Sequence, residues 1–206
     1  MSTSDVIMFK GIDIIVPRHF EDFRGSYRET YNEYEAKERG LPHFVTDAIS
    51  VSRRNTIRGF HGDFVTWKLV QCLSGEIYAR IIDLRKDSET FGRVFSMMLT
   101  GKNHKMLLIP PGCGNSFLAL SDEIVYHYKQ SEYYEGKQFT LKYDAVDGWP
   151  IDPAQVILSE RDRLATNSLS AFVKEMKQRE DLRNNPYYAV RKIFHTVYSG
   201  IVGDKV

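Results

Sequence analysis

The chain has 206 residues, 42% of them apolar and 27% charged, a composition typical of a soluble globular protein with one domain of ordinary size, alone or with an appendage. Its net charge of +1 gives no electrostatic reason to expect a nucleic acid or a membrane as partner. The two cysteines lack the spacing of a zinc site or a disulfide framework, and no leader peptide or apolar run of about 20 residues is visible, so we expect a cytoplasmic protein.

The first forty residues predict short elements. Two apolar runs, at 6–9 and 12–16, flank a glycine turn and predict two short strands. Residues 20–29 contain a turn glycine and then alternate, which indicates a loop that enters a strand. Charged residues at helical spacing in 31–40, followed by glycine and proline, predict a short surface helix.

From Phe44 to Leu120 the pattern is one short apolar run after another, with turn residues at intervals of roughly 8–12 positions. Residues 125–129 and 139–143 predict further strands, with a loop at 131–136 between them. Because no helix-length pattern interrupts this series, a parallel βαβ fold is disfavoured. The sequence therefore predicts a mainly β domain, either a sandwich or a small barrel.

The C-terminal part has a different character. A short polar segment at 157–162 is of the kind that strand-rich domains use to fold back across an open end. Apolar positions within 169–176 and within 190–197 recur at helical spacing and predict two amphipathic helices. We therefore expect one domain over residues 1–168, with residues 169–206 as its C-terminal helical appendage.

The stretch from Arg58 to Arg85 concentrates residues that can carry chemistry. His61 is a candidate general base, although a lone histidine is more often a structural residue. Lys68 begins a strand, and a buried ammonium must pair with an acid or face a ligand, because leaving it unpaired costs several kcal/mol. Asp83 on the next strand is the candidate structural partner of Lys68.

A metal site is the other chemistry to consider for this stretch. His61 and Asp63 stand at i and i+2, on one face of a strand, as metal ligands in small barrels can. The later strand that should complete the site offers Asn115 where a histidine is needed. His104 and His127 are isolated in the sequence. The sequence therefore predicts no metal.

Tyrosines gather near two strand ends, at Tyr126, Tyr128, Tyr133 and Tyr134. Most tyrosines in such numbers are core or interface residues. One that faces a cavity could act as an acid, because its ordinary pKa near 10 keeps the proton available at neutral pH. Asp162, judged by residue type alone, is a surface charge in a polar loop.

A series of motifs runs in order from about residue 6 to residue 165: Asp22-Phe23-Arg24-Gly25 with Glu29, Arg58-Gly59-Phe60-His61, Lys68-Leu69-Val70, Gly75-Glu76, Asp83-Leu84-Arg85-Lys86-Asp87-Ser88, Thr90-Phe91-Gly92, Ile109-Pro110-Pro111-Gly112, Tyr128-Lys129, Tyr133-Tyr134, Trp149-Pro150 and Leu158-Ser159-Glu160-Arg161-Asp162. Together they resemble the dTDP-4-dehydrorhamnose 3,5-epimerase family of nucleotide-sugar enzymes. The resemblance implies a cupin-type jelly-roll barrel without a metal or other cofactor, usually a homodimer that exchanges N-terminal strands. It implies an isomerase acting on a nucleotide-linked 4-keto sugar.

The same resemblance assigns residue roles. His61 is similar in position to the family's general base and Asp162 to the carboxylate that orients it. Tyr128 is similar to the acid that returns a proton on the opposite face, and Lys68 to the residue that holds the ketone oxygen. The implied substrate contacts are Arg24, Glu29, Arg58, Tyr134 and, where most members have a histidine, Asn115.

Two departures from the usual pattern concern the substrate. Gly62 and Asp63 follow the base histidine in place of an aromatic residue and a glutamine, and Asn115 replaces a histidine. Both departures resemble the subgroup that epimerises GDP-4-keto-heptoses for capsule synthesis. We therefore expect inversion at C3, C5 or both in such a sugar. A 3,4-ketoisomerase and a non-catalytic barrel that binds nucleotide sugars are the alternatives.

Overall fold

The computed structural model describes residues 11–136 and 138–178. The chain forms one unit up to Asn167, and a second unit begins at Ser168. The elements of the first unit are β1 (Asp13–Ile15), β2 (His19–Asp22), β3 (Gly25–Arg28), α1 (Glu33–Glu38), β4 (Thr46–Arg53), β5 (Ile57–Gly62), β6 (Lys68–Ser74), β7 (Glu76–Asp83), β8 (Val94–Thr100), β9 (Met106–Ile109), β10 (Cys113–Ala119), β11 (Glu123–Gln130), β12 (Phe139–Thr140), two 3-10 turns (Tyr143–Ala145 and Pro153–Gln155) and α2 (Glu160–Leu164).

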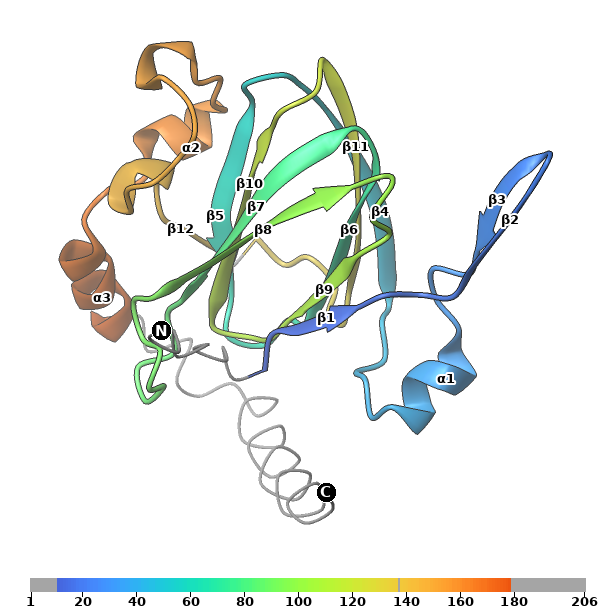
Figure 1. The fold of residues 1–206 in the computed structure, drawn as a ribbon. Helices are drawn as coiled ribbons and strands as arrows, with labels where there is room; N and C mark the ends of the chain where they lie inside the picture. The colour runs from blue at the N-terminus through green and yellow to red at the C-terminus, as the bar shows by residue number, and fades with distance from the viewer. Residues whose placement is uncertain (1–10, 137, 179–206) are drawn as a thin grey trace, which may run out of the picture. The chain divides into compact units, whose positions relative to one another are not determined.

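Two five-stranded sheets make up most of this unit (Figure 1). One has the strand order β1-β9-β6-β11-β4 and the other β12-β5-β10-β7-β8, and every strand pairing in both is antiparallel. A separate two-stranded sheet, the β2–β3 hairpin, extends away from them beside α1. The prediction of a mainly β, cupin-type jelly roll is confirmed, although the strand pairings of the described residues form two sheets and do not close into one barrel.

The main core lies between the two sheets because their strands alternate apolar side chains inward. Ile77 and Ile81 of β7, Leu107 of β9 and Ile124 of β11 are completely buried there. Each such side chain stabilises the fold by roughly 1.5–3 kcal/mol. This core holds the two sheets as a rigid frame around the site.

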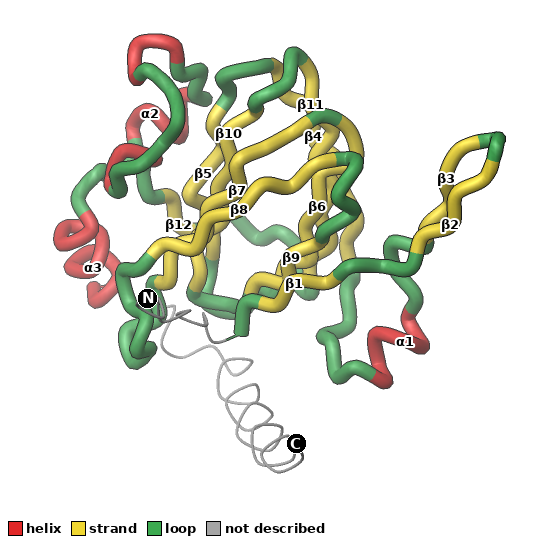
Figure 2. Tube along the Cα trace, in the orientation of Figure 1, coloured by secondary structure: helices red, strands yellow, loops and turns green. Residues whose placement is uncertain are grey.

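Helices occur only near the two ends of the described chain (Figure 2). Helix α1 begins where the side chain of Asn32 accepts a hydrogen bond from the backbone of Glu35, as predicted for 31–40. Helix α3 (Leu169–Gln178) belongs to the second unit and confirms the helix expected at 169–176. None of the described helices is long and apolar enough to cross a membrane.

Two element predictions need correction. The strand expected over 139–143 ends at Thr140, since Tyr143 starts a 3-10 turn. The polar segment at 157–162 is not loop throughout, because Ser159 caps the short helix α2. The strand expected at 6–9 and the helix expected at 190–197 lie outside the described residues. Treating 169–206 as an appendage of the first domain remains a prediction.

Candidate active site

The centre of the site is a histidine–carboxylate pair. His61 is the fifth residue of β5, and its Nε2 lies 2.5 Å from Oδ1 of Asp162. The Asp162 side chain is 3% exposed and that of His61 is 25% exposed, so the pair is shielded on the carboxylate side and open on the imidazole side. A histidine held in this way can take a proton from a ligand while the carboxylate orients the ring.

Backbone pairing at the start of β5 brings Asp162 to His61 across 101 residues of sequence. Ile157 exchanges hydrogen bonds with this part of the chain: its carbonyl accepts from the N–H of Ile57, and its N–H donates to the carbonyl of Asn55. Helix α2 comes directly afterwards, and Arg161 donates to the hydroxyl of Thr140, the β12 residue that pairs with His61. The segment that carries Asp162 is therefore fixed to the same strands as the histidine.

The Asp162 carboxylate is held in its ionised form. Burial opposes its charge, but the hydrogen bonds from His61 and from Ser159 outweigh burial and lower the pKa of this carboxyl. Ser159 Oγ donates to Oδ2 at 2.9 Å and accepts from the Asp162 backbone N–H at 3.1 Å. Both carboxylate oxygens of Asp162 are therefore engaged, one by the base and one by the helix cap.

Lys68 lies beside the pair at the first position of β6. The residue is 7% exposed, and its Nζ donates to the backbone carbonyl of His61 at 3.2 Å. Burial lowers the pKa of Lys68 to about 8, against the opposing charge of Asp63. An ammonium that is poorly solvated in this way can stabilise negative charge that develops on a bound ligand.

The suggested pairing of Lys68 with Asp83 is wrong. Asp83 is completely buried, and its carboxylate accepts hydrogen bonds from Arg85, Ser88 and Thr90 at 2.6–2.9 Å. These bonds overcome burial and lower the pKa of Asp83 to about 2. Asp83 is therefore used to order the loop after β7, and the hydrogen bond that Lys68 makes goes to the backbone of His61.

Glycines on either side of His61 allow β5 to lie very close to β10. A Cβ at Gly59, where φ is +110°, would stand 2.3 Å from the Asn115 carbonyl oxygen. A Cβ at Gly62 would stand 2.4 Å from the Cys113 carbonyl oxygen and 2.6 Å from the Phe139 ring. The aromatic residue usual after the base histidine therefore has no room at position 62 in this chain.

Asn115 of β10 is the direct cross-strand neighbour of His61. Its Nδ2 donates to the hydroxyl of Tyr126 at 3.0 Å. Its Oδ1 is buried and has no hydrogen-bond partner among the described residues. A buried acceptor without a partner costs about 1–3 kcal/mol, so this oxygen is a ready contact for a ligand hydroxyl.

Tyr128 comes from the facing sheet, on β11. Its ring centroid lies 6.0 Å from that of Tyr126, and it packs against the main core, as the predicted alternation requires. His127, its neighbour, points the other way and pairs with Asp47 at 2.6 Å. The two sheets therefore supply different reactive groups, with His61 on one and Tyr128 and Lys68 on the other.

Arg58 lies three residues before His61 on β5. Its guanidinium donates to Ser52 Oγ at 2.9 Å and to the Val51 carbonyl at 3.3 Å, both on β4. Strands β4 and β5 belong to different sheets, so this arginine spans the edge between them. The edge between the two sheets therefore carries an exposed cation that can pair with an anionic ligand group.

Three predicted contact residues lie outside the strands of the two five-stranded sheets, which carry His61, Lys68 and Tyr128. Arg24 is in the turn of the β2–β3 hairpin, 76% exposed, and pairs with Asp22. Glu29 comes just after the hairpin and accepts from Asn32 at 2.7 Å. Tyr134 lies in the loop after β11 and is 63% exposed. In Figure 1 the hairpin extends away from the strand that carries His61.

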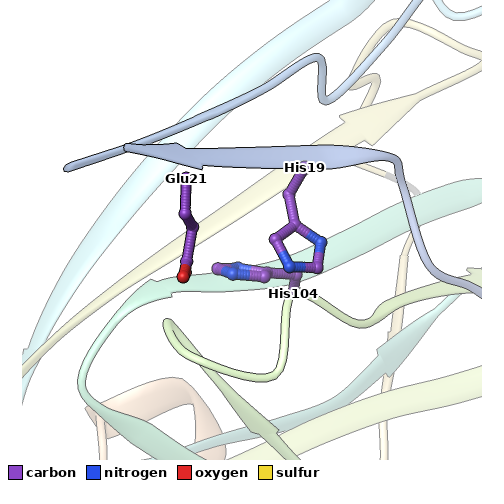
Figure 3. Close-up of side chains that lie close together, drawn as sticks. All are labelled: His19, Glu21 and His104. Carbon is purple, nitrogen blue, oxygen red and sulfur yellow. The ribbon is translucent and has the colours of Figure 1, made fainter. Parts of the chain in front are cut away.

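The structure shows what surrounds the acidic and histidine residues that were considered as metal ligands. Oδ1 of Asp63 accepts hydrogen bonds from the backbone N–H groups of Val65 and Thr66, so this carboxylate shapes the turn after β5. His104 is not isolated, because His19 and Glu21 of the hairpin lie against it (Figure 3). His127 is not isolated either, because Gln71 contacts its Nδ1 and Asp47 contacts its Nε2.

Sequence reasoning named Ser159 and Tyr126 but did not anticipate their hydrogen bonds to Asp162 and Asn115. Ser159 and Asp162 have the spacing of a helix-capping pair, and that signal could have placed the carboxylate at the start of a helix. No local pattern connects Tyr126 with Asn115, because the two strands belong to different sheets.

A family model described as dTDP-4-dehydrorhamnose 3,5-epimerase matches residues 7–169 of this chain. A dTDP-4-dehydrorhamnose 3,5-epimerase of Methanothermobacter thermautotrophicus is 38% identical over 161 residues, covering 74% of this chain and 87% of the relative. The enzyme of the same name from Escherichia coli is 33% identical, covering 74% of this chain and 88% of the relative.

Solved structures give the same result. The crystal structure of a dTDP-4-dehydrorhamnose 3,5-epimerase from Elizabethkingia anophelis is 37% identical with a TM-score of 0.70, covering 79% of this chain and 93% of that one. A 3,5-epimerase from Legionella pneumophila, in complex with dTDP-4-keto-L-rhamnose, is 32% identical with a TM-score of 0.73, covering 81% of this chain and 93% of that one.

Proposed function

This chain belongs to the dTDP-4-dehydrorhamnose 3,5-epimerase family of isomerases, and from that premise we propose that it inverts C3, C5 or both in a nucleotide-linked 4-keto sugar. The observation that carries the proposal is the His61–Asp162 pair, together with the buried Lys68 that donates a hydrogen bond to the backbone carbonyl of His61. A C–H bond next to a ketone is acidic only because the ketone can accept its electrons. A base and a cation for the ketone oxygen are therefore both required.

In the proposed reaction His61 removes the proton beside the C4 ketone, and the C–H electrons move onto O4 as an enolate. Lys68 stabilises that oxygen, and Asp162 stabilises the imidazolium that His61 becomes. Tyr128 then donates its phenolic proton to the carbon from the opposite face, and the enolate electrons return. The substrate loses and gains one proton at each carbon that is inverted, so no redox cofactor is needed, and solvent exchange resets His61 and Tyr128.

Arg24, Glu29, Arg58 and Tyr134 are proposed to contact the nucleotide sugar. Arg24 and Glu29 lie away from His61 in the same chain, which supports a homodimer in which the hairpin of one protomer serves the site of the other. Apolar side chains on the hairpin and just before it, Phe20, Tyr27 and Val16, are each 54–65% exposed and would be covered by a partner. Light scattering should give twice the chain mass, and a monomer that is fully active would contradict the shared site.

The substrate is proposed to be a GDP-linked 4-keto-heptose. Support comes from the glycine required at position 62 and from Asn115, whose Oδ1 can accept from a sugar hydroxyl where the family's histidine stands. A place in capsule or lipopolysaccharide synthesis and a cytoplasmic location remain predictions. Turnover of GDP-, dTDP-, CDP- and UDP-linked 4-keto sugars, measured side by side, tests the nucleotide and the sugar.

Deuterium exchange tests the reaction itself. In D2O the wild type should label C3, C5 or both of an accepted sugar, and NMR of the product identifies each labelled carbon. His61→Asn should abolish the label, whereas the matched change at the exposed His43 should leave it unchanged. A product with its ketone at a new carbon would identify a 3,4-ketoisomerase. Binding without any exchange would identify a non-catalytic barrel and overturn the proposal.

A further inference from the structure

Three potential metal ligands meet outside the active site, between the β2–β3 hairpin and the turn from β8 to β9. His19 and Glu21 are two residues apart on β2 and point to the same side, towards His104 of the turn (Figure 3). One ligand atom from each of the three side chains lies within 4.8 Å of the other two. The rings of His19 and His104 have centroids 4.7 Å apart and are inclined at 51°.

The donor set favours a particular class of ion. Two imidazoles and one carboxylate, with a water as the fourth ligand, suit Zn²⁺, whereas Mg²⁺ and Ca²⁺ prefer oxygen ligands throughout. Zinc bonds of about 2.0–2.2 Å would bring the donor atoms to roughly 3.3 Å from one another. The exposed side chains of His19 and Glu21 can rotate by the small amount required.

A positive charge already occupies this place. Nη1 of Arg28, the residue paired with His19 in the hairpin, lies 2.8 Å from Nδ1 of His104. A guanidinium can only donate, so this imidazole nitrogen carries a lone pair. An imidazole nitrogen with a free lone pair is the form that binds a metal ion.

Arg28 itself is poorly satisfied, which makes it replaceable. Its Nε is buried and has no hydrogen-bond partner among the described residues. An ion that took its place at His104 would break a single hydrogen bond and would release the arginine towards solvent. The side chains that now surround the guanidinium would then surround the smaller Zn²⁺ ion.

We propose that His19, Glu21 and His104 bind Zn²⁺ and that the ion ties the hairpin to the β8–β9 turn. The hairpin pairs with neither five-stranded sheet, so its own backbone leaves it attached mainly through the chain at its two ends. A zinc ion bound by residues of both segments would restrict its movement. None of the three ligands is among the residues assigned to the epimerase reaction, although the hairpin that the ion would hold also carries Arg24.

Zinc titration of the full chain, by competition with a chromogenic chelator at pH 7, tests the site. The wild type should bind one equivalent of Zn²⁺, and His19→Ala, Glu21→Gln and His104→Asn should each weaken binding at least about tenfold. Asparagine is chosen at 104 because it tolerates the positive φ of 55° found there. Arg28→Met should tighten binding by removing the competing cation.

His43→Ala is the matched control, since His43 is an exposed histidine 3.6 Å from Glu33 and should not change the affinity. Amide hydrogen exchange gives a second readout: zinc should protect residues 19–28 in the wild type and the control but not in His104→Asn. No stoichiometric binding would overturn the proposal. Binding that survives both His19→Ala and His104→Asn would also overturn it and would place the ion elsewhere, for example at His61 and Asp162.

Discussion

Replacing Lys68 by methionine should abolish activity and stabilise the fold. Burial lowers the pKa of Lys68 from 10.5 to about 8, and each unit corresponds to about 1.36 kcal/mol. Keeping the charge at pH 7 therefore costs the folded state about 3 kcal/mol. Losing the hydrogen bond to the His61 carbonyl offsets about 1 kcal/mol of this. The free energy of unfolding should rise by about 2 kcal/mol.

The pH dependence of this gain depends on where Lys68 titrates. Below pH 8 the lysine is protonated in both the folded and the unfolded protein, so the full cost is present. Between about 8 and 10.5 the unfolded chain binds more protons than the folded one, so wild-type stability rises with pH relative to the methionine variant. The advantage of Lys68→Met should therefore shrink across this window and disappear at its upper end.

Urea unfolding of both proteins at about pH 7, 8.5 and 9.5, with equal m-values as the check on two-state behaviour, measures the difference. Other titrating groups are common to both proteins and cancel in the comparison. A variant that is less stable than the wild type at neutral pH, or an advantage that stays constant up to about pH 9.5, would refute the reasoning. A Lys68→Met variant that keeps its epimerase activity would show that the buried charge is not needed for catalysis.

Three further changes test the surroundings of the site. Asp162→Asn should lower kcat by about 10³–10⁴ with KM little changed, because His61 loses its orienting carboxylate. Steady-state kinetics checks this, and a kcat within about tenfold of the wild-type value would contradict it. Asp83→Asn should lower the free energy of unfolding by about 2 kcal/mol at pH 7. This difference between variant and wild type is fully present above pH 3.8 and should vanish as the pH falls through about 2. Acid unfolding curves of the two proteins that stay separated at that pH would disprove it. Gly62→Ala should cost more than about 1 kcal/mol and much of the activity, because the new methyl meets the Cys113 carbonyl; thermal unfolding at unchanged Tm would show that β5 can move away.

The periodicity of apolar residues in the sequence was sufficient to predict most strands of the two sheets. Runs such as those of β6 and β7 are apolar, short and bounded by turn residues, so their existence can be predicted from local sequence. Residue type and spacing also selected His61 and Lys68 as reactive. Local sequence could not supply the partner of either residue, because partners depend on which strands become neighbours.

Lys68 and Asp83 illustrate this limit. Their strands are consecutive, which made a pair plausible, but the loop after β7 folds back so that Arg85, Ser88 and Thr90 surround the carboxylate. Asn115 likewise bonds to Tyr126 on the facing sheet, a contact that no spacing rule anticipates. The role of Asp162 was available only from the family resemblance, since 101 residues separate it from His61.

The pairing of Ile157 with the start of β5 has a consequence for the order in which the protein becomes functional during synthesis. Strands β4 to β11 end at Gln130 and contain all the buried residues of the main core, so this part can assemble while the ribosome is still translating the C-terminal segment. The segment around residue 157 emerges later and docks beside β5, and Asp162 follows it to His61. We expect a nascent chain halted before residue 157 to be folded in its sheets and catalytically silent, with activity appearing in a single step as helix α2 leaves the exit tunnel.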